Sequence, residues 1–227
     1  YVSNEYTPGS IAQLKRSLPK FEIKTFNPRE DLPADFYQSS GLLIRSSFSV
    51  HKQLLEKLEN IKWICTSTSG FDHLDLKTCV QKDIQVSFTP EANVQSVTEL
   101  TLYFLLEGFH KFYEFRQLMR NNQWKQIKSK SHQLKGKTLG IIGFGRIGQS
   151  IARIASALGM HLAVHDPYVD PQLIQKQGGE SLGLSETFRM ADVLSLHVPL
   201  TDKTKNLVNE KTLALMQNTS FLVNTCR

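Results

Sequence analysis

The stretch that decides the fold is Leu134 to Asp166, which reads LKGKTLGIIGFGRIGQSIARIASALGMHLAVHD. Its apolar run 137–142 is short and bounded by glycine, which predicts a buried strand. The glycine-rich sequence GFGRIG (143–148) follows at once, and apolar residues then recur at helical spacing. A second apolar run, 161–165, ends in an aspartate. This order of strand, turn, helix, strand and acid indicates a dinucleotide-binding unit.

The three glycines of this turn each meet a different requirement of a bound pyrophosphate. Gly143 allows a tight turn out of the strand, Gly145 lets the backbone approach the phosphates, and Gly148 lets the helix pack close to the sheet. The helix N-terminus presents backbone N–H groups and a partial positive charge to the same phosphates. We therefore expect the phosphates to rest on residues 143–148.

Asp166 is the expected sugar contact, because it lies 18 residues after Gly148 at the end of the second strand. Its carboxylate can accept hydrogen bonds from both hydroxyls of an adenosine ribose and would repel a 2′-phosphate, which favours NAD over NADP. A methyltransferase also combines a glycine-rich first turn with an acid on the second strand. That alternative stays open on the motif alone.

Length and composition point to an ordinary globular protein. The chain has 227 residues, 40% of them hydrophobic and 21% charged, which suits one large domain or two smaller ones. No apolar run approaches the roughly 18 residues of a membrane span, and the N-terminal sequence lacks the pattern of a signal peptide. It also begins without Met, so we expect that an upstream piece is missing.

The cysteines and the net charge narrow the classes of partner. Cys65, Cys79 and Cys226 lack metal-ligand spacing and are odd in number, which favours reduced thiols in the cytoplasm and no metal site. The net charge is +6, and the basic residues concentrate within 111–137. That stretch indicates a solvent-exposed helix face and a loop, so we expect no nucleic-acid partner and no membrane partner.

Strands and helices alternate in the first ninety residues. Buried strands are predicted at 41–44, 62–66 and 84–88, with helices at 51–58 and 76–81 between them. Such alternation predicts a small parallel sheet of the flavodoxin type.

The remainder of the chain is expected to form the cofactor-binding domain. Residues 90–93 resemble a hinge, and two helices, 94–108 and 110–124, precede the glycine-rich unit. A helix at 185–190 has Ser185 as its expected N-cap, and a last strand is predicted at 220–224. We therefore divide the α/β chain into residues 1–91 and 92–227, with a cleft between the two domains.

Five pieces of the chain together resemble the D-isomer-specific 2-hydroxyacid dehydrogenases. They are TSGFDHLDL (68–76), NVQSVTELTLYFLLE (93–107), GFGRIG (143–148), LHVPLT (196–201) and LVNTCR (222–227). The resemblance implies a flavodoxin-like substrate domain followed by a Rossmann NAD-binding domain. It also implies an NAD-dependent oxidoreductase that interconverts a D-2-hydroxy acid and its 2-keto acid. Phosphoglycerate, glycerate or hydroxypyruvate, glyoxylate and lactate all remain possible substrates.

On the cofactor side, the resemblance assigns roles residue by residue. Arg146 and Ile147 would supply backbone amides to the pyrophosphate, alongside the glycines named above. Val198, between His197 and Pro199, would contact the adenosine side of NAD through its backbone.

On the substrate side, Ser69 and Gly70 of the first domain would close over substrate and cofactor. Thr225, Cys226 and Arg227 would line the nicotinamide end. Arg227 also stands where the family keeps its substrate-binding arginine, whose planar guanidinium can grip a carboxylate with paired hydrogen bonds.

The family's proton donor, a His paired with a Glu, lies downstream of the last residue. We therefore expect a dehydrogenase cut short at its C-terminus, which binds NAD without turnover. His197 is a weak substitute on the adenosine side, and the other histidines, His73 among them, read as surface or packing residues. The two helices after residue 93 resemble the family's dimer arm, so a homodimer is expected. A non-catalytic NAD(H)-sensing protein of the same fold is the alternative.

Overall fold

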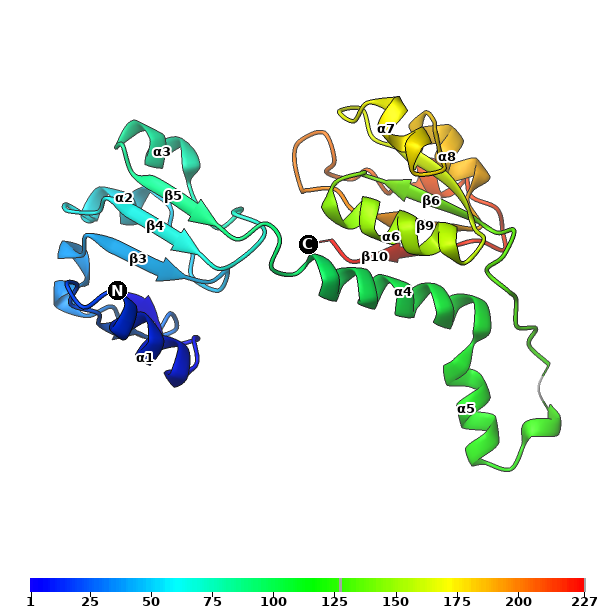
Figure 1. Cartoon of the computed structure of the whole chain (residues 1–227), viewed down its shortest axis with the longest axis horizontal. Helices are drawn as coiled ribbons and strands as arrows, with labels where there is room; N and C mark the ends of the chain where they lie inside the picture. Colours follow the sequence, from blue (N-terminus) through cyan, green and yellow to red (C-terminus); the bar gives the residue numbers. More distant parts are fainter. Residues whose placement is uncertain (127, 227) are drawn as a thin grey trace. The chain divides into compact units, whose positions relative to one another are not determined.

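The computed structural model of the chain describes residues 1–126 and 128–226 (Figure 1). The chain divides into two compact units, Tyr1–Asn93 and Val94–Arg227. Each unit contains a five-stranded sheet in which every strand pair is parallel. The expected α/β class, with a flavodoxin-like and a Rossmann sheet, is confirmed.

The first unit has the strand order β2-β1-β3-β4-β5, which is the flavodoxin order. Its outermost strand next to β1 contains two residues only, Thr25 and Phe26. The elements are β1 (Val2–Ser3), α1 (Pro8–Ser17), β2 (Thr25–Phe26), η1 (Ala34–Gln38), β3 (Gly41–Ile44), α2 (Lys52–Lys57), β4 (Trp63–Thr66), α3 (Leu76–Gln81) and β5 (Gln85–Phe88).

Aromatic rings pack against one another in the core of this unit. Phe36 is fully buried, and its ring lies edge-on to Phe26 at a centroid distance of 5.0 Å. Phe26 makes a similar contact with Phe48 at 4.9 Å. Such tilted pairs are favoured by the ring quadrupoles and add to the gain from burial.

The second unit has the strand order β10-β9-β6-β7-β8. The chain runs outward from β6 to β8 and then returns to β9 on the other side of β6. Its elements are α4 (Val94–His110), α5 (Phe112–Arg120), η2 (Trp124–Gln126), β6 (Thr138–Ile142), α6 (Arg146–Ala157), β7 (His161–His165), α7 (Pro171–Lys176), β8 (Gly179–Ser181), α8 (Leu184–Met190), β9 (Val193–Leu196), α9 (Glu210–Leu213) and β10 (Phe221–Asn224).

Helix α4 packs on the strand that lies farthest from it in the sequence. Leu105 and Phe109 of α4 are buried in the same core cluster as Val223 of β10. The ring of Phe109 lies edge-on to that of Phe221 at 5.1 Å. Gly108 permits this approach, because a Cβ at this position would overlap the Phe221 ring.

The cap of α8 corrects one expectation. The N-cap residue is Gly183, in an extended conformation, and Ser185 lies inside the helix. The hydroxyl of Thr187 donates a hydrogen bond to the carbonyl of Gly183 at 3.0 Å. Asn209, in contrast, caps α9 with its side chain in a reciprocal capping box. No helix in the described part of the chain is long and apolar enough to cross a membrane.

Candidate functional site

The glycine-rich turn lies where the strand order of the second sheet reverses. Gly143 donates its N–H to the carbonyl of His165 at 2.9 Å, and His197 donates its own to Ile142 at 2.8 Å. The ends of β7 and β9 therefore flank the turn that leaves β6. Gly143 has a φ of +93°, and a Cβ there would lie 2.5 Å from the His197 carbonyl oxygen. Only glycine fits this position, and ligands of open parallel sheets bind at such a reversal.

Gly145 and Gly148 serve different purposes in the same turn. A Cβ on Gly148 would overlap the carbonyl oxygen of Gly143, so this glycine lets α6 pack against the turn. A Cβ on Gly145 would meet nothing within 4 Å, and Gly145 is the N-cap residue of α6. The absent side chain thus leaves space at the helix N-terminus, where Arg146 and Ile147 contribute backbone amides. This open cradle fits a pyrophosphate.

Asp166, the expected sugar contact, also accepts a hydrogen bond from the backbone of the glycine-rich turn. Its Oδ2 accepts a hydrogen bond from the N–H of Phe144 at 2.7 Å, and its Oδ1 accepts one from Tyr168 at 2.9 Å. A carboxylate has about four acceptor sites, so each oxygen can still accept a ligand hydroxyl. The residues present therefore fit a nucleoside diol beside the turn.

The side chain of His197 is half-buried in the second unit. Its Nε2 lies 2.9 Å from the hydroxyl of Ser195, which is itself fully buried on β9. Burial lowers the pKa of His197 to about 4, so the imidazole is neutral near pH 7. A neutral ring held on the strand makes a poor proton donor. The backbone carbonyl of His197, in contrast, touches the turn at Gly143.

A cavity of about 230 Å³ lies at the carboxyl ends of β9 and β10, and Val198, Pro199 and Cys226 are among its lining residues. The Cys226 thiol donates to the carbonyl of Leu196 at 3.1 Å, and burial raises its pKa. Thr225 lies beside α4, with its hydroxyl 3.3 Å from that of Thr101. Arg227 lies outside the described residues.

Ser69 and Gly70 belong to the first unit, in the loop between β4 and α3. Both are half-buried, and the hydroxyl of Thr68 donates to the carbonyl of Gly70 at 2.6 Å. The loop is also tied to β3, because Ser67 donates its N–H to the carbonyl of Ile44 at 3.2 Å. This loop stands at the carboxyl edge of its sheet, as a ligand loop of an open parallel sheet should.

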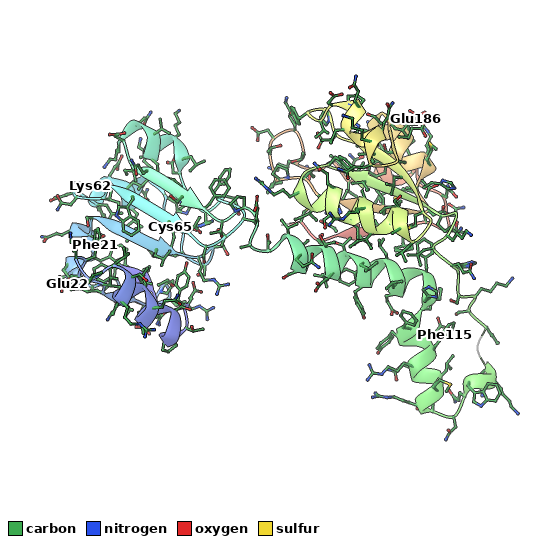
Figure 2. All side chains as sticks on the ribbon, viewed as in Figure 1. Phe21, Glu22, Lys62, Cys65, Phe115 and Glu186 are labelled. Atoms are coloured by element: carbon green, nitrogen blue, oxygen red, sulfur yellow. The ribbon has the colours of Figure 1, made fainter. Side chains whose placement is uncertain are left out.

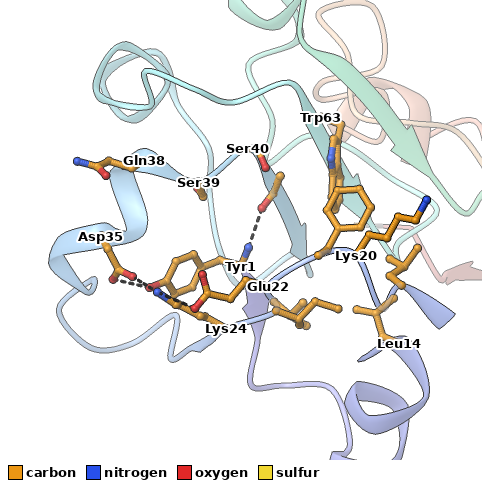
Figure 3. Close-up of a pocket in the computed structure, with 15 residues that line it drawn as sticks. Tyr1, Leu14, Lys20, Glu22, Lys24, Asp35, Gln38, Ser39, Ser40 and Trp63 are labelled. Atoms are coloured by element: carbon orange, nitrogen blue, oxygen red, sulfur yellow. Dashed lines mark hydrogen bonds and ion pairs between the residues drawn. The ribbon is translucent and has the colours of Figure 1, made fainter. Parts of the chain in front are cut away.

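A second cavity, of about 460 Å³, lies in the first unit (Figure 3). It is lined by Tyr1, Gly41 and Trp63, which stand at the amino ends of β1, β3 and β4, and by the ion pair between Lys24 and Asp35. The cavity is therefore at the edge of the sheet opposite to Ser69 and Gly70. Its position argues against a role in binding the expected substrate.

The cysteines and possible metal ligands add no further site. Cys65, on β4 in Figure 2, is a free thiol, as are Cys79 and Cys226. Within residues 1–126 and 128–226, no cluster of three or more His, Cys, Asp or Glu side chains could hold a metal ion.

Comparison with known proteins decides between the classes that share such a turn. Residues 102–227 match the sequence model of the D-isomer specific 2-hydroxyacid dehydrogenase, NAD binding domain. The chain belongs to the D-isomer specific 2-hydroxyacid dehydrogenase family. Its second unit thus carries the NAD-binding domain of this dehydrogenase family, and the methyltransferase alternative is set aside.

Curated relatives and solved structures of the dehydrogenase family agree with this assignment. The chain is 33% identical to a D-3-phosphoglycerate dehydrogenase of Methanocaldococcus jannaschii over 91% of its own length and 40% of that protein. It is 30% identical to a glyoxylate reductase of Aeropyrum pernix over all of its length and 70% of that protein. The crystal structure of the Aquifex aeolicus D-lactate dehydrogenase, complexed with NAD and lactic acid, superposes with a TM-score of 0.91 at 27% identity. That match covers all of this chain and 68% of the other.

Some contacts of the site were not foreseen from the sequence, although two of them have a signal there. Asp166 accepts from the N–H of Tyr168 two residues later, which is the turn that Asx residues favour. Ser195, on β9, and His197, which directly follows the strand, are two positions apart and so share a face. The bond from Phe144 to Asp166 joins two segments 22 residues apart, and no local pattern predicts it.

Proposed function

We propose that the protein is an NAD-dependent oxidoreductase that interconverts a D-2-hydroxy acid and its 2-keto acid. The observation that carries the proposal is the turn 143–148 at the reversal of the second sheet, with the Asp166 carboxylate bonded to it. Phosphoglycerate dehydrogenase and glyoxylate reductase among the relatives, and lactate dehydrogenase among the structures, support a small 2-hydroxy acid as the substrate class.

In this proposal the second unit, with residues 92–227 as the domain, binds the cofactor. The amides of Arg146 and Ile147 bind the pyrophosphate at the start of α6, and Asp166 accepts the adenosine ribose hydroxyls. Val198 contacts the adenosine side through its backbone, between His197 and Pro199. When bound, the nicotinamide ring supplies or accepts the hydride of the reaction.

The substrate is assigned to groups that suit a carboxylate next to the reacting carbon. Residues 1–91 form the substrate domain, in which the backbone of Ser69 and Gly70 binds one carboxylate oxygen. Arg227 grips the carboxylate with its guanidinium, and Thr225 and Cys226 border the nicotinamide end. Paired hydrogen bonds from a planar guanidinium fix the orientation of the acid for hydride transfer.

The test uses both binding and turnover. Calorimetric titration of this chain with NADH should show binding that is weakened at least about tenfold in Gly145→Ala, whose added methyl group fills the cradle. The full-length protein should oxidise NADH with at least one of glyoxylate, hydroxypyruvate, pyruvate and phosphohydroxypyruvate. Absence of NADH binding by the wild-type chain, or binding that Gly145→Ala leaves unchanged, would refute the cofactor site. Absence of turnover with the whole panel would refute the reaction.

A homodimer is proposed as the assembly, formed through α4, α5 and the turn that follows. Large apolar side chains there are more than half exposed, which is unusual for a monomer surface; they are Tyr103, Phe112, Tyr113, Met119 and Trp124. Phe115, labelled on α5 in Figure 2, is half-buried beside them.

Sedimentation analysis tests the dimer. The wild-type protein should sediment as a dimer, and the double variant Phe112→Ser/Tyr113→Ser should sediment as a monomer. Val80→Ser is the matched control, because Val80 is an exposed apolar residue of the first unit. A wild-type monomer, or a double variant that remains dimeric, would refute this interface.

A further inference from the structure

A row of buried polar side chains lies directly under the loop that carries Ser69 and Gly70. Thr66, the last residue of β4, is fully buried, and Thr68 and His73 are nearly so. The Thr66 hydroxyl lies 3.0 Å from Nε2 of His73 and 2.8 Å from the hydroxyl of Thr68. Thr68 in turn donates to the carbonyl of Gly70 at 2.6 Å.

The direction of every hydrogen bond in this row follows from its last member. A carbonyl oxygen only accepts, so the single hydroxyl hydrogen of Thr68 points at Gly70. Thr68 must then accept from Thr66, and Thr66 must accept from His73. The Nε2 of His73 therefore carries a hydrogen. The three side chains form one relay of donors that ends on the backbone of the loop.

The relay fixes a backbone position that would otherwise swivel. Gly70 has no Cβ, so its φ and ψ are weakly restrained by local sterics. A bond to its carbonyl holds the peptide plane that follows Gly70, which limits how the preceding Ser69–Gly70 amide can turn. Because the relay is buried, water competes poorly for its donors, and hydrogen bonds are stronger in such surroundings.

We propose that His73, acting through Thr66 and Thr68, is a positioning residue that aims the Ser69–Gly70 backbone at the substrate carboxylate. This inference rests on the proposed function for the identity of the ligand. None of the three side chains touches substrate in this scheme. Their effect is on the affinity for the acid and leaves the cofactor site in the other unit unaffected.

The first test needs no activity. Long-range proton–nitrogen NMR spectra of the whole chain should show His73 protonated at Nε2 near neutral pH. In Thr66→Val and Thr68→Val, which keep the side-chain shape, the backbone NMR order parameters of Ser69 and Gly70 should fall from about 0.85 toward 0.6. The matched control is Thr78→Val, which removes the buried hydroxyl that donates to Asp75 at 2.7 Å, at the start of α3 and outside the relay.

The second test uses the full-length protein and the keto acid that it turns over best. Thr66→Val, Thr68→Val and His73→Met should raise the KM for the acid about tenfold, and the KM for NADH should stay within about twofold. His73→Gln keeps an N–H donor and should restore most of the affinity. Thr78→Val should match the relay variants in loss of thermal stability without a change in either KM.

The outcomes separate this inference from the proposed function. A His73 that is unprotonated at Nε2, unchanged order parameters of Ser69 and Gly70, or an unchanged KM for the acid in Thr66→Val and Thr68→Val would overturn the relay. A wild-type protein that turns over no keto acid would overturn the proposed function alone, because the NMR results would still report whether the relay holds the loop.

Discussion

The two loops at the carboxyl edges of the sheets are held by opposite kinds of hydrogen bond. In the second unit, a carboxylate accepts from the backbone, since Asp166 accepts a hydrogen bond from the N–H of Phe144. In the first unit, a hydroxyl donates to the backbone, since the Thr68 hydroxyl donates to the carbonyl of Gly70. The first arrangement places a charge at the proposed cofactor site, whereas the second is neutral and buried. In the proposed function, one residue therefore serves fold and ligand together in the second unit, and the two tasks fall to different residues in the first.

The largest effect is expected where the backbone itself admits no substitute. Gly143→Ala forces a positive φ on a residue with a Cβ and presses that Cβ against the His197 carbonyl at 2.5 Å. We expect a loss of about 4 kcal/mol in the free energy of unfolding, measured by urea titration. Gly145→Ala, with open space around it, should lose less than about 1 kcal/mol. Equal losses in the two variants would contradict the distinction between a packing glycine and a ligand glycine.

A pH-dependent loss is expected next, from His197 in the second unit. Its pKa in the folded state is about 4, below the ordinary 6.5, so the unfolded chain takes up a proton first as the pH falls. Stability is complete above about pH 6.5 and declines by about 3 kcal/mol as the pH falls toward 4. Urea titrations at several pH values should show this decline reduced in His197→Gln. Equal pH dependence in the variant and the wild-type chain would rule out His197 as its source.

Asp166→Asn tests the carboxylate that accepts from the glycine-rich turn of the second unit. An amide group offers one acceptor oxygen in place of two, so one of the two backbone donors, Phe144 or Tyr168, loses its partner. We expect a loss of about 2 kcal/mol in stability together with at least tenfold weaker NADH binding, measured by titration calorimetry. Stability lost without a change in NADH affinity would show that Asp166 holds the turn only.

Thr68→Val tests the hydroxyl that donates to the loop of the first unit. Its effect on the free energy of unfolding should be smaller than that of Asp166→Asn. A neutral hydrogen bond contributes about 1 kcal/mol, and valine fills the same volume. Urea titration should therefore show about half the loss found for Asp166→Asn, with NADH affinity unchanged. A loss as large as that of Asp166→Asn would remove the contrast between the charged and the neutral arrangement.

Apolar runs bounded by turn residues explain why much of the fold could be predicted from the sequence. Strands β3 and β7 and helix α3 have the expected bounds, because each is an apolar or amphipathic run between clear turn residues. Strands β1 and β8 contain two and three residues, too few to show any period, and neither was expected. The cap of α8 was assigned to Ser185 because serine is a preferred cap, but the extended backbone of Gly183 begins the helix two residues earlier.

The candidate site divides in the same way. That Asp166 lies beside the glycine-rich turn could be predicted, because their spacing along the chain reflects one local unit. The buried state of His73 could not, because its partners Thr66 and Thr68 precede it and only the folded loop brings them together. Likewise, nothing local predicts the lowered pKa of His197, since the residues that cover a strand end come from distant elements.

The contact between α4 and β10 has a consequence for how the protein emerges from the ribosome. The ring of Phe109 is covered by Phe221, and more than a hundred residues must be synthesised between the two. Until then the apolar face of a 17-residue helix has no strand to lie on. Nascent chains that stop short of β10 should accordingly be held by chaperones, and release should coincide with the arrival of that strand.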